Sequence, residues 1–386
     1  MTTPAPEMTS KPIDVAGKLH ELARAKPAPV ISVYLDTRWS DEHQRDRVRV
    51  FLKNEIRKAA AMAGGQLDVE LAWLDAEGER LVGQTFHPEA AGVAMFAGGS
   101  GSWREILSFA VPFTDSFALA DTPRLRPLVR ALGEAPRTAV LFVDGESAHL
   151  TALTAQGAAE DVALETTDVV GHHRRGGWAL LLQSRYQRHT QEHRRRHFDA
   201  VAHALADLVD HYGVRAIVLA GEPRNLAVFR AHVPPRLADR LVGDVAGSRH
   251  EPPSALAERA LELIRRRDAG HAAAALDTVL MDAEGGGRAA SGVEATIDAV
   301  NRGTVDRLYL LASYGEDGRV CLGCHALQRA EDVACRWCGA ATSALELGEA
   351  MVQRVLAAGG DVASIDVHAG LERAGGVAAL LRYPPR

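Results

Sequence analysis

The chain has 386 residues, of which 47% are hydrophobic and 24% charged, and its formal net charge at pH 7 is −6. This composition is ordinary for a globular protein and excludes a largely disordered, collagenous or coiled-coil chain. No uninterrupted apolar run approaches the roughly 18 residues that span a bilayer, and the start of the chain lacks the pattern of a signal peptide. We therefore expect a cytoplasmic protein of two or three domains, with no membrane partner and a frayed segment over about its first 12 residues.

The first third of the chain alternates strand and helix patterns. β-Branched and apolar residues predict three strands, at Pro29–Leu35, Ala91–Ala97 and Phe109–Phe113. Apolar residues spaced among charges predict a helix at Asp41–Met62. We place a first α/β domain at residues 1–134.

The second predicted domain opens with a hairpin. The apolar runs Thr138–Val143 and His149–Leu153 flank an Asp-Gly turn, which is typical of two antiparallel strands. A long helix is predicted at Ser184–Tyr212, whose second half carries an apolar stripe and whose first half carries none, so the first half should project beyond the core. The strand Ala216–Ala220 follows, and we place this domain at residues 135–250.

The last part of the chain, residues 251–386, also mixes helices and strands. Periodicity predicts helices at Ala255–Arg267, His271–Met281, Val293–Asn301 and Leu345–Ala358. Short apolar runs predict strands at Asp306–Ala312, Val362–Val367 and Val377–Tyr383. The fold class is therefore mixed α/β throughout, with a third domain at residues 251–386.

All four cysteines of the chain lie in one short stretch of the last domain. Two Cys-x-x-Cys pairs separated by ten residues can close a tetrahedral site around structural Zn²⁺; their members are Cys321, Cys324, Cys335 and Cys338. Two disulfides or a redox pair are the alternatives, but a cytosolic protein keeps its thiols reduced. We predict a zinc-ribbon-like minidomain at about residues 315–342. His325 is a possible substitute ligand, although a surface histidine is the simpler interpretation.

The net charge hides a strongly basic segment between His172 and His197. It contains one acid, Glu192, so its charge is +6 and the rest of the chain carries −12. Its seven arginines are Arg174, Arg175, Arg185, Arg188, Arg194, Arg195 and Arg196. A basic cluster on an acidic body favours docking to a polyanion, and the alternative is a solvated helix face. The histidines at 189, 193 and 197 share one helical face; without an accompanying acid they are better explained as solvated or RNA-facing than as a metal site.

Three features of this region follow one another in the order of a known superfamily. Val140–Gly145 supplies a hairpin strand and turn, Arg175-Gly176-Gly177 a basic paired-glycine segment, and Arg185–His189 an arginine- and aromatic-rich start to the long helix. This order resembles the middle domain of the archaeo-eukaryotic release factor and Pelota superfamily. It is most similar to the bacterial members known as Vms/Ankzf-type peptidyl-tRNA hydrolases.

The resemblance continues in the other two domains. Three further segments resemble segments of the family: Ser32–Asp36, Asn301–Leu310 and Gly375–Tyr383. Several members also carry a zinc minidomain where this chain has its four cysteines. A three-domain, release-factor-like architecture is therefore implied. The chain departs from the family where Trp178 follows the two glycines and where Leu180–Leu182 stand as an insertion. It also lacks the Asn-Ile-Lys-Ser motif that reads stop codons, so stop-codon decoding is not expected.

The family's reaction is hydrolysis of the ester that joins a nascent peptide to tRNA. The resemblance makes Gln183 the counterpart of the catalytic glutamine, since its amide can orient a water molecule, and gives Gly176 and Gly177 the backbone N–H groups that stabilise developing charge. The basic segment would hold phosphates of tRNA or ribosomal RNA. An ordinary polar residue near a helix N-terminus is the competing interpretation of Gln183, and the leucine insertion bears directly on its reach.

Two functions follow from the resemblance. The first is a ribosome rescue and quality-control factor that enters the tRNA site and the peptidyl-transferase centre and releases peptide from peptidyl-tRNA. The second is a non-catalytic ribosome A-site binder that acts in hibernation or in recognition of stalled ribosomes. A stand-alone RNA-binding protein is a third, weaker alternative. We expect a monomer whose partners are the ribosome, peptidyl-tRNA and ribosomal RNA, with a translational GTPase as a further candidate.

Overall fold

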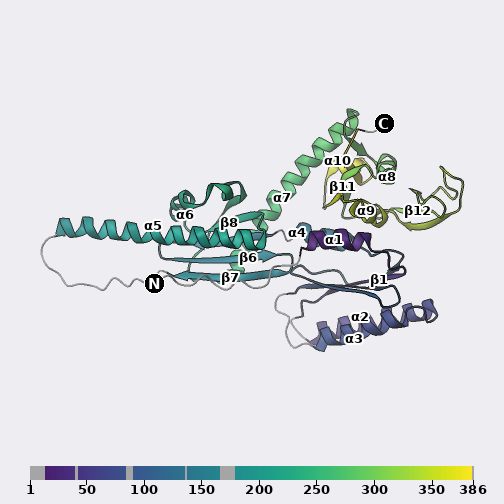
Figure 1. Cartoon of the computed structure of the whole chain (residues 1–386), viewed down its shortest axis with the longest axis horizontal. Helices are drawn as coiled ribbons and strands as arrows, with labels where there is room; N and C mark the ends of the chain where they lie inside the picture. Colours follow the sequence, from purple (N-terminus) through teal and green to yellow (C-terminus); the bar gives the residue numbers. More distant parts are fainter. Residues whose placement is uncertain (1–13, 40–41, 84–89, 135–136, 166–178, 385–386) are drawn as a thin grey trace. The chain divides into compact units, whose positions relative to one another are not determined.

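The computed structural model describes residues 14–39, 42–83, 90–134, 137–165 and 179–384 (Figure 1). The chain forms two compact units. The first unit is built around residues 135–267, and the second unit consists of residues 13–134 together with residues 268–386. Helices and strands occur in both units, so the predicted mixed α/β class is confirmed. The division into three domains stays a prediction.

A five-stranded sheet forms the centre of the unit around residues 135–267, with strand order β7-β6-β5-β8-β9. Its strands are β5 (Thr138–Val143), β6 (Ser147–Thr154), β7 (Gly157–Glu165), β8 (Ala216–Ala220) and β9 (Leu241–Val245). β5 pairs antiparallel with β6, and β6 with β7, whereas β8 runs parallel to both β5 and β9. The predicted hairpin and the predicted strand at Ala216–Ala220 are confirmed.

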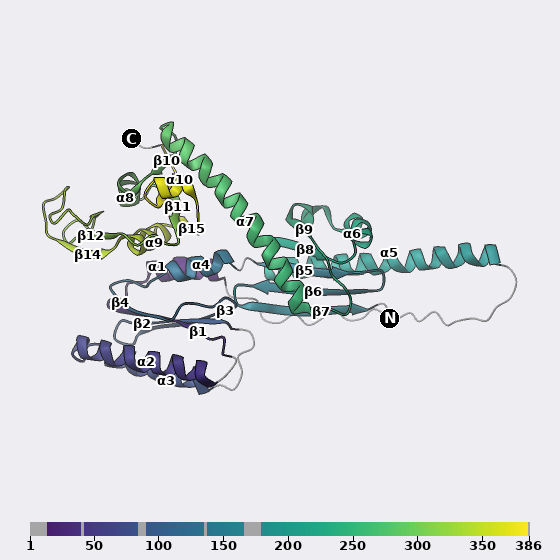
Figure 2. The ribbon, with the colours of Figure 1, turned by 180° about the vertical axis from the view of Figure 1, so that it is seen from behind.

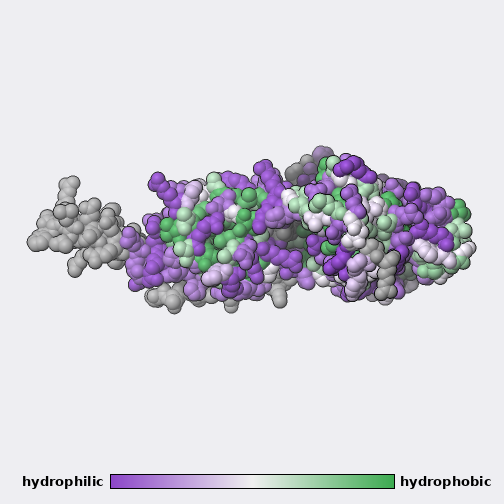
Figure 3. All heavy atoms as spheres, turned by 90° about the horizontal axis from the view of Figure 1, so that it is seen from above, coloured by the Kyte–Doolittle hydropathy of each residue, from purple (hydrophilic) through white to green (hydrophobic). Residues whose placement is uncertain are grey.

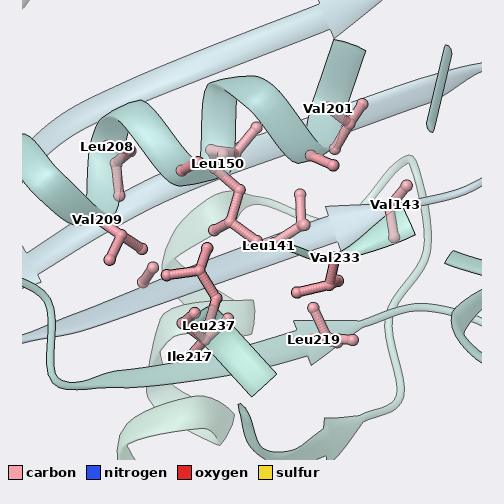
Figure 4. Packing of buried hydrophobic residues seen from close by; sticks show 14 of the residues in the cluster. Leu141, Val143, Leu150, Val201, Leu208, Val209, Ile217, Leu219, Val233 and Leu237 are labelled. Carbon is pink, nitrogen blue, oxygen red and sulfur yellow. The ribbon is translucent and has the colours of Figure 1, made fainter. Parts of the chain in front are cut away.

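Helices cover both faces of this sheet. They are α5 (Ala179–Tyr212), α6 (Pro223–Phe229), the 3₁₀ turns Arg230–His232 and Pro235–Arg240, and α7 (Pro253–Glu284). Side chains of β5 alternate between the two faces, because successive residues of a strand point to opposite sides. Leu141 and Val143 pack with α5 and α6 (Figure 4), and Val140 and Phe142 pack with the first part of α7. β5 is therefore buried along its whole length.

The long helix α5 has two different halves. Its second half buries an apolar stripe that includes Phe198, Val201 and Leu205, each with no exposed surface, and burying one such side chain stabilises the fold by about 1.5–3 kcal/mol. Its first half extends past the ends of the strands (Figures 1 and 2), as predicted. The helix begins at Ala179 rather than at the predicted Ser184. Ala179 and the three leucines that follow are strong helix formers, and no breaker separates them from Ser184.

The other unit opens with a four-stranded antiparallel sheet of order β3-β2-β1-β4. Its strands are β1 (Val30–Asp36), β2 (Gly92–Gly98), β3 (Trp103–Phe109) and β4 (Ser116–Ala120). The helices α2 (Glu42–Ala63) and α3 (Asp68–Gly83) cover one face. The predicted strand at Phe109–Phe113 was wrong beyond its first residue. Pro112 has no N–H to donate to a ladder, and the chain leaves the sheet before it.

A second four-stranded sheet, of order β10-β16-β11-β15, lies in the same unit. Its strands are β10 (Ala289–Ser291), β11 (Val305–Leu311), β15 (Asp361–Ile365) and β16 (Val377–Leu381). The associated helices are α8 (Val293–Asn301), α9 (Leu347–Ala357) and α10 (Ala369–Arg373). Two helices from the start of the chain, α1 (Val15–Arg24) and α4 (Arg126–Glu134), contact α9 and β15 respectively. Residues far apart in the sequence thus form one unit.

The predicted pair of helices at Ala255–Arg267 and His271–Met281 was wrong, because α7 runs without interruption from Pro253 to Glu284. Gly270 lies between the two predicted helices. It is exposed, and one glycine in an exposed helix costs only about 1 kcal/mol relative to alanine. The alanines that follow it favour continuation of the helix.

On the face shown in Figure 3, hydrophobic residues are interspersed among hydrophilic ones. Within the described ranges, none of the helices combines the length and the apolar character that crossing a bilayer requires.

Candidate nucleic-acid interface and metal centre

Exposed arginines gather on α5 just before its buried half. Arg195 contacts Glu192 at 3.0 Å and Asp199 at 3.1 Å, and Arg196 contacts Glu192 at 3.0 Å. Hydrogen bonds from both arginines lower the pKa of Glu192 to about 2. Exposed ion pairs of this kind contribute little to stability, so both guanidinium groups can exchange these carboxylates for phosphates.

The turn between β5 and β6 lies against the same part of α5. A Cβ atom at Gly145 would be 3.5 Å from Cδ of Arg194, which is ordinary van der Waals contact, so the turn lies against this side chain. Asp144 accepts hydrogen bonds from the backbone N–H groups of Glu146 (2.8 Å) and Ser147 (2.7 Å). The Asp-Gly turn of the predicted motif therefore braces the base of the basic helix.

Arg249 fixes the other side of this turn. Its guanidinium pairs with Asp144 at 3.1 Å and with Glu146 at 3.2 Å. Burial raises the pKa of Asp144, but the backbone hydrogen bonds and Arg249 outweigh burial and hold that pKa below its ordinary value. Sequence reasoning missed Arg249, because about 100 residues separate it from the turn and no motif connects the two.

His197 does not face solvent or RNA as predicted. Its residue is 6% exposed. Burial lowers the pKa of the imidazole, against an opposing hydrogen bond to the backbone of Ser147 and nearby acids. A neutral, buried histidine cannot contribute charge to a polyanion site. Its position one helical turn before Val201, in the buried stripe, was the sequence signal for burial.

The remaining predicted residues of this region divide into two groups. Arg174, Arg175, Gly176 and Gly177 lie outside the described residues. Gln183, Arg185 and Arg188 lie on α5, whose backbone is described there while these side chains are not. Gln183 is the fifth residue of the helix, so the leucine run before it is helical.

The four predicted metal ligands lie together beside a small three-stranded sheet, β13-β12-β14: Cys321 ends β12, and the other three lie in the connections between strands. The strands are β12 (Asp317–Cys321), β13 (Leu327–Arg329) and β14 (Thr342–Glu346). Cys321 Sγ lies 3.4 Å from Cys338 Sγ, and Cys324 Sγ lies 3.6 Å from Cys335 Sγ. All four sulfur atoms are within 4.8 Å of one another.

This geometry fits a tetrahedral metal ion and not a disulfide. A disulfide requires about 2.05 Å between sulfurs, whereas Zn–S bonds of about 2.3 Å in a tetrahedron place sulfurs about 3.8 Å apart. The backbone N–H groups of Gly323 and Cys324 each donate to Cys321 Sγ at 3.3 Å. These donors lower the pKa of the Cys321 thiol to about 6 and favour the thiolate that a metal binds. His325 is exposed and is not part of the cluster.

The sheet β13-β12-β14 is called the cysteine sheet below. Asn301 connects it to the end of α8. Its side chain donates to the carbonyl of Leu327 at 2.8 Å and accepts from the N–H of Leu327 at 2.8 Å. Arg336 adds ion pairs to Glu294 at 2.8 Å and to Asp298 at 2.6 Å, both on α8. The cysteine cluster is therefore held within the second unit by paired polar contacts.

Residues 123–265 match the family model of the bacterial archaeo-eukaryotic release factor family 10. This segment is release-factor-like. The match covers 143 of the 386 residues and includes the β5–β6 turn, the paired glycines and α5, which are the features that carried the predicted resemblance. Among curated proteins, none matches the chain. The cysteine centre lies outside the release-factor-like segment.

Three of the solved structures that the chain resembles at low similarity are aRF1, Pelota and Dom34. Archaeal termination factor aRF1 shares 18% identity over 96% of this chain and 97% of its own, with a TM-score of 0.26. Pelota of Archaeoglobus fulgidus shares 14% over 97% and 94%, with a TM-score of 0.35. Dom34 of S. cerevisiae shares 12% over 76% and 79%, with a TM-score of 0.40. TM-scores this low carry no argument about the fold or role of this chain. The likeness to release factors therefore rests on the match of residues 123–265 alone.

Proposed function

We propose that this protein is a ribosome-associated factor that enters the tRNA site and releases the nascent peptide from peptidyl-tRNA without reading a stop codon. The observation that carries the proposal is the release-factor match of residues 123–265, which includes both the paired glycines and α5. The finer similarity to the Vms/Ankzf-type hydrolases is part of the same proposal. A ribosomal role places the protein in the cytoplasm.

The basic helix is proposed to hold nucleic-acid phosphates. Arg195 and Arg196 have side chains that are 58% and 69% exposed, and their present partners are carboxylates of the same helix. An RNA phosphate offers a guanidinium group the same paired acceptors. Binding should therefore replace weak contacts within the helix by stronger contacts to RNA, and it should weaken as salt concentration rises.

Gln183 is proposed to orient the water molecule that attacks the ester. Hydrolysis of an activated ester needs a positioned water and donors aimed at the developing charge, and it needs no strong base. The glutamine amide supplies both a donor and an acceptor, and backbone N–H groups at Gly176 and Gly177 would stabilise the oxygen of the leaving ribose. These roles come from the family resemblance.

The test is peptide release from ribosome-bound peptidyl-tRNA. Wild-type protein is compared with the Gln183→Ala variant at equal ribosome occupancy. The matched control is Gln191→Ala, since Gln191 is an exposed glutamine two helical turns further along α5. Occupancy is measured in the same samples by co-sedimentation, which separates a defect in chemistry from a defect in binding.

The second candidate function is a non-catalytic binder of the ribosomal A site. The observation that favours it is the start of α5 at Ala179, because Gln183 then belongs to a regular helix preceded by a helical turn of leucines. A wild-type protein that binds ribosomes tightly and releases no peptide would establish this function. Binding to RNA without ribosomes would instead support the stand-alone RNA-binding alternative.

The cysteine centre is proposed to hold Zn²⁺. Four thiolates complete a tetrahedral site and leave no open coordination position, so the ion would stabilise the sheet β13-β12-β14 and take no part in ester hydrolysis. Its residues lie outside the matched segment. A translational GTPase is a candidate delivery partner on the family resemblance.

A further inference from the structure

Arg354 lies on α9 beside the cysteine cluster, and among the described residues it has no carboxylate partner. Its guanidinium donates to the carbonyl of His325, the residue that follows Cys324, and to Oδ1 of Asn301 at 3.1 Å. The negative charge that acts on it is that of Cys324. Arg354 is therefore a cation whose opposite charge is the cluster itself.

Two other arginines near the cysteines differ in this respect. Arg329 pairs with Glu331 at 2.7 Å. Arg336, within the second Cys-x-x-Cys pair, has both of its carboxylate partners on α8. Because carboxylates already offset these two positive charges, neither arginine adds much positive potential at the sulfur atoms.

The surroundings of Arg354 hold it in place. Met351, one helical turn earlier on α9, has no exposed surface, and the amide of Gln353 donates to the carbonyl of Ala23 on α1 at 2.8 Å. Burial lowers the pKa of Arg354, and the charge of Cys324 opposes that shift. A half-buried guanidinium group without an opposite charge is costly, so the thiolates stabilise it at this position.

The contact with His325 fixes the turn that presents Cys324. His325 has a φ of +60°, a left-handed conformation that residues other than glycine rarely adopt. Its N–H donates to the carbonyl of Cys321 at 3.0 Å, and its own carbonyl accepts from Arg354. Both amide groups of this unfavourable turn are thus held, and the side chain of Cys324 is directed toward the other three sulfur atoms.

The charge of a filled site also needs compensation. Four thiolates exceed the charge of one Zn²⁺ ion by about two units, and that surplus is stabilised by hydrogen-bond donors and cations around the ligands. Cys321 accepts two backbone N–H groups. Arg354 supplies a full positive charge on the side of Cys324.

We propose that Arg354 is a positioning residue of the metal site, which fixes the turn that presents Cys324 and offsets part of the negative charge of the four thiolates around a bound Zn²⁺. The inference rests on the proposed zinc ion and on no part of the proposed peptide release. It connects metal binding to α9, and through α9 to the interior of the second unit.

The test measures the metal affinity and the spectrum of the site in the full-length protein. Zinc is removed with a chelator under reducing conditions and replaced by Co²⁺, whose sulfur-to-metal charge-transfer band reports the thiolate ligands. Displacement of Co²⁺ then gives the affinity for Zn²⁺. Arg354→Met keeps the length of the side chain and removes its charge, so it should weaken Zn²⁺ binding about 10- to 100-fold. The band should move to longer wavelength, since a thiolate without a nearby cation gives up an electron more easily.

Three further variants separate charge from structure. Arg354→Lys keeps the charge and should restore most of the affinity and the wild-type band. Arg329→Met removes an arginine of the cysteine sheet whose charge a carboxylate offsets, and it should change neither quantity. Gln328→Ala removes a fully buried amide that donates to the carbonyls of Asp332 and Ala334. It should lower the melting temperature without moving the band.

An unshifted band and an unchanged Zn²⁺ affinity in Arg354→Met would overturn the role of Arg354. Equal losses in Arg354→Met and Arg354→Lys with an unmoved band would do the same, since a purely structural residue gives that pattern. A wild-type protein that binds neither metal would overturn the zinc proposal and this inference together. Because ribosomes take no part in these measurements, none of the results bears on peptide release.

Discussion

Asn301 and Leu327 exchange two hydrogen bonds of 2.8 Å, one in each direction between a side-chain amide and a backbone amide. The pair joins the end of α8 to a strand of the cysteine sheet. It gives a structural role to the first residue of Asn301–Leu310, one of the segments noted in the sequence analysis. Arg354 also donates to the Asn301 Oδ1 atom at 3.1 Å, so this amide connects three elements.

Replacement of Asn301 by alanine should loosen the cysteine sheet. It leaves the N–H and carbonyl of Leu327 without their partners, which costs about 1–3 kcal/mol per buried group. Hydrogen exchange should therefore rise in β12 and β13 before it rises elsewhere in the second unit. Asn54→Ala is the control, because Asn54 is exposed and makes one long contact of 3.4 Å. Equal exchange in both variants would contradict the role assigned to Asn301.

One zinc ion per chain should co-purify with the protein when none is added. Cys335→Ser removes a buried ligand and should abolish stoichiometric metal in elemental analysis, with a lower melting temperature. His325→Ala should keep the metal, since His325 is not one of the clustered ligands. Four titratable thiols in metal-free, folded wild-type protein would show that the site is not a zinc site.

Stability should fall as pH rises from about 4.5 to about 7, because of Glu349. This carboxyl group is 13% exposed and accepts hydrogen bonds from the backbone N–H groups of Leu125 and Arg126. Burial raises its pKa to about 7 from an ordinary value of 4.5, despite those bonds. A raised folded-state pKa means that the folded protein holds the proton more tightly, so its contribution is complete below pH 4.5 and is lost by pH 7.

The variant Glu349→Gln should remove this pH dependence and keep the acceptor for the backbone of α4. The shift corresponds to an upper bound of about 3 kcal/mol in the free energy of unfolding between the two ends of the range. Denaturant unfolding at pH 4.5 and pH 8 measures the difference. Glu222→Gln, at an exposed position of the other unit, should keep the slope of the wild type. A wild-type slope in Glu349→Gln would contradict the prediction.

Ribosome binding should depend on the arginines of α5 more than on equally exposed arginines elsewhere. The double variant Arg195→Ala with Arg196→Ala should weaken binding and reduce its dependence on salt by roughly two phosphate contacts. α7 offers a matched control, since Arg265 and Arg266 pair with Glu262 at the same spacing at which the α5 arginines pair with Glu192. Equal losses in both double variants would indicate non-specific attraction.

Local sequence patterns predicted much of the fold, because hydrophobic period and turn residues act over short distances. The helix α8 and the strands β5 and β8 have the predicted bounds. The same patterns divided α7 into two helices, whereas the helix continues through Gly270. They also misjudged His197, whose helical position beside the buried stripe outweighed its polarity.

Contacts between distant parts of the chain could not be predicted from the sequence. Glu349 meets Leu125 across 224 positions, and Arg249 meets Asp144 across 105. The cysteine cluster was predictable because its spacing alone dictates the chemistry, whereas the role of Gln183 depends on a segment that the described residues do not include.

Peptide release from ribosome-bound peptidyl-tRNA tests the central claim most directly. We predict that wild-type protein releases peptide, that Gln183→Ala slows release about a hundredfold at equal ribosome occupancy, and that Gln191→Ala releases at the wild-type rate. Equal rates for all three proteins would remove Gln183 from the mechanism and leave the hydrolase. Tight ribosome binding by a wild-type protein that releases no peptide would contradict the hydrolase and leave the non-catalytic binder.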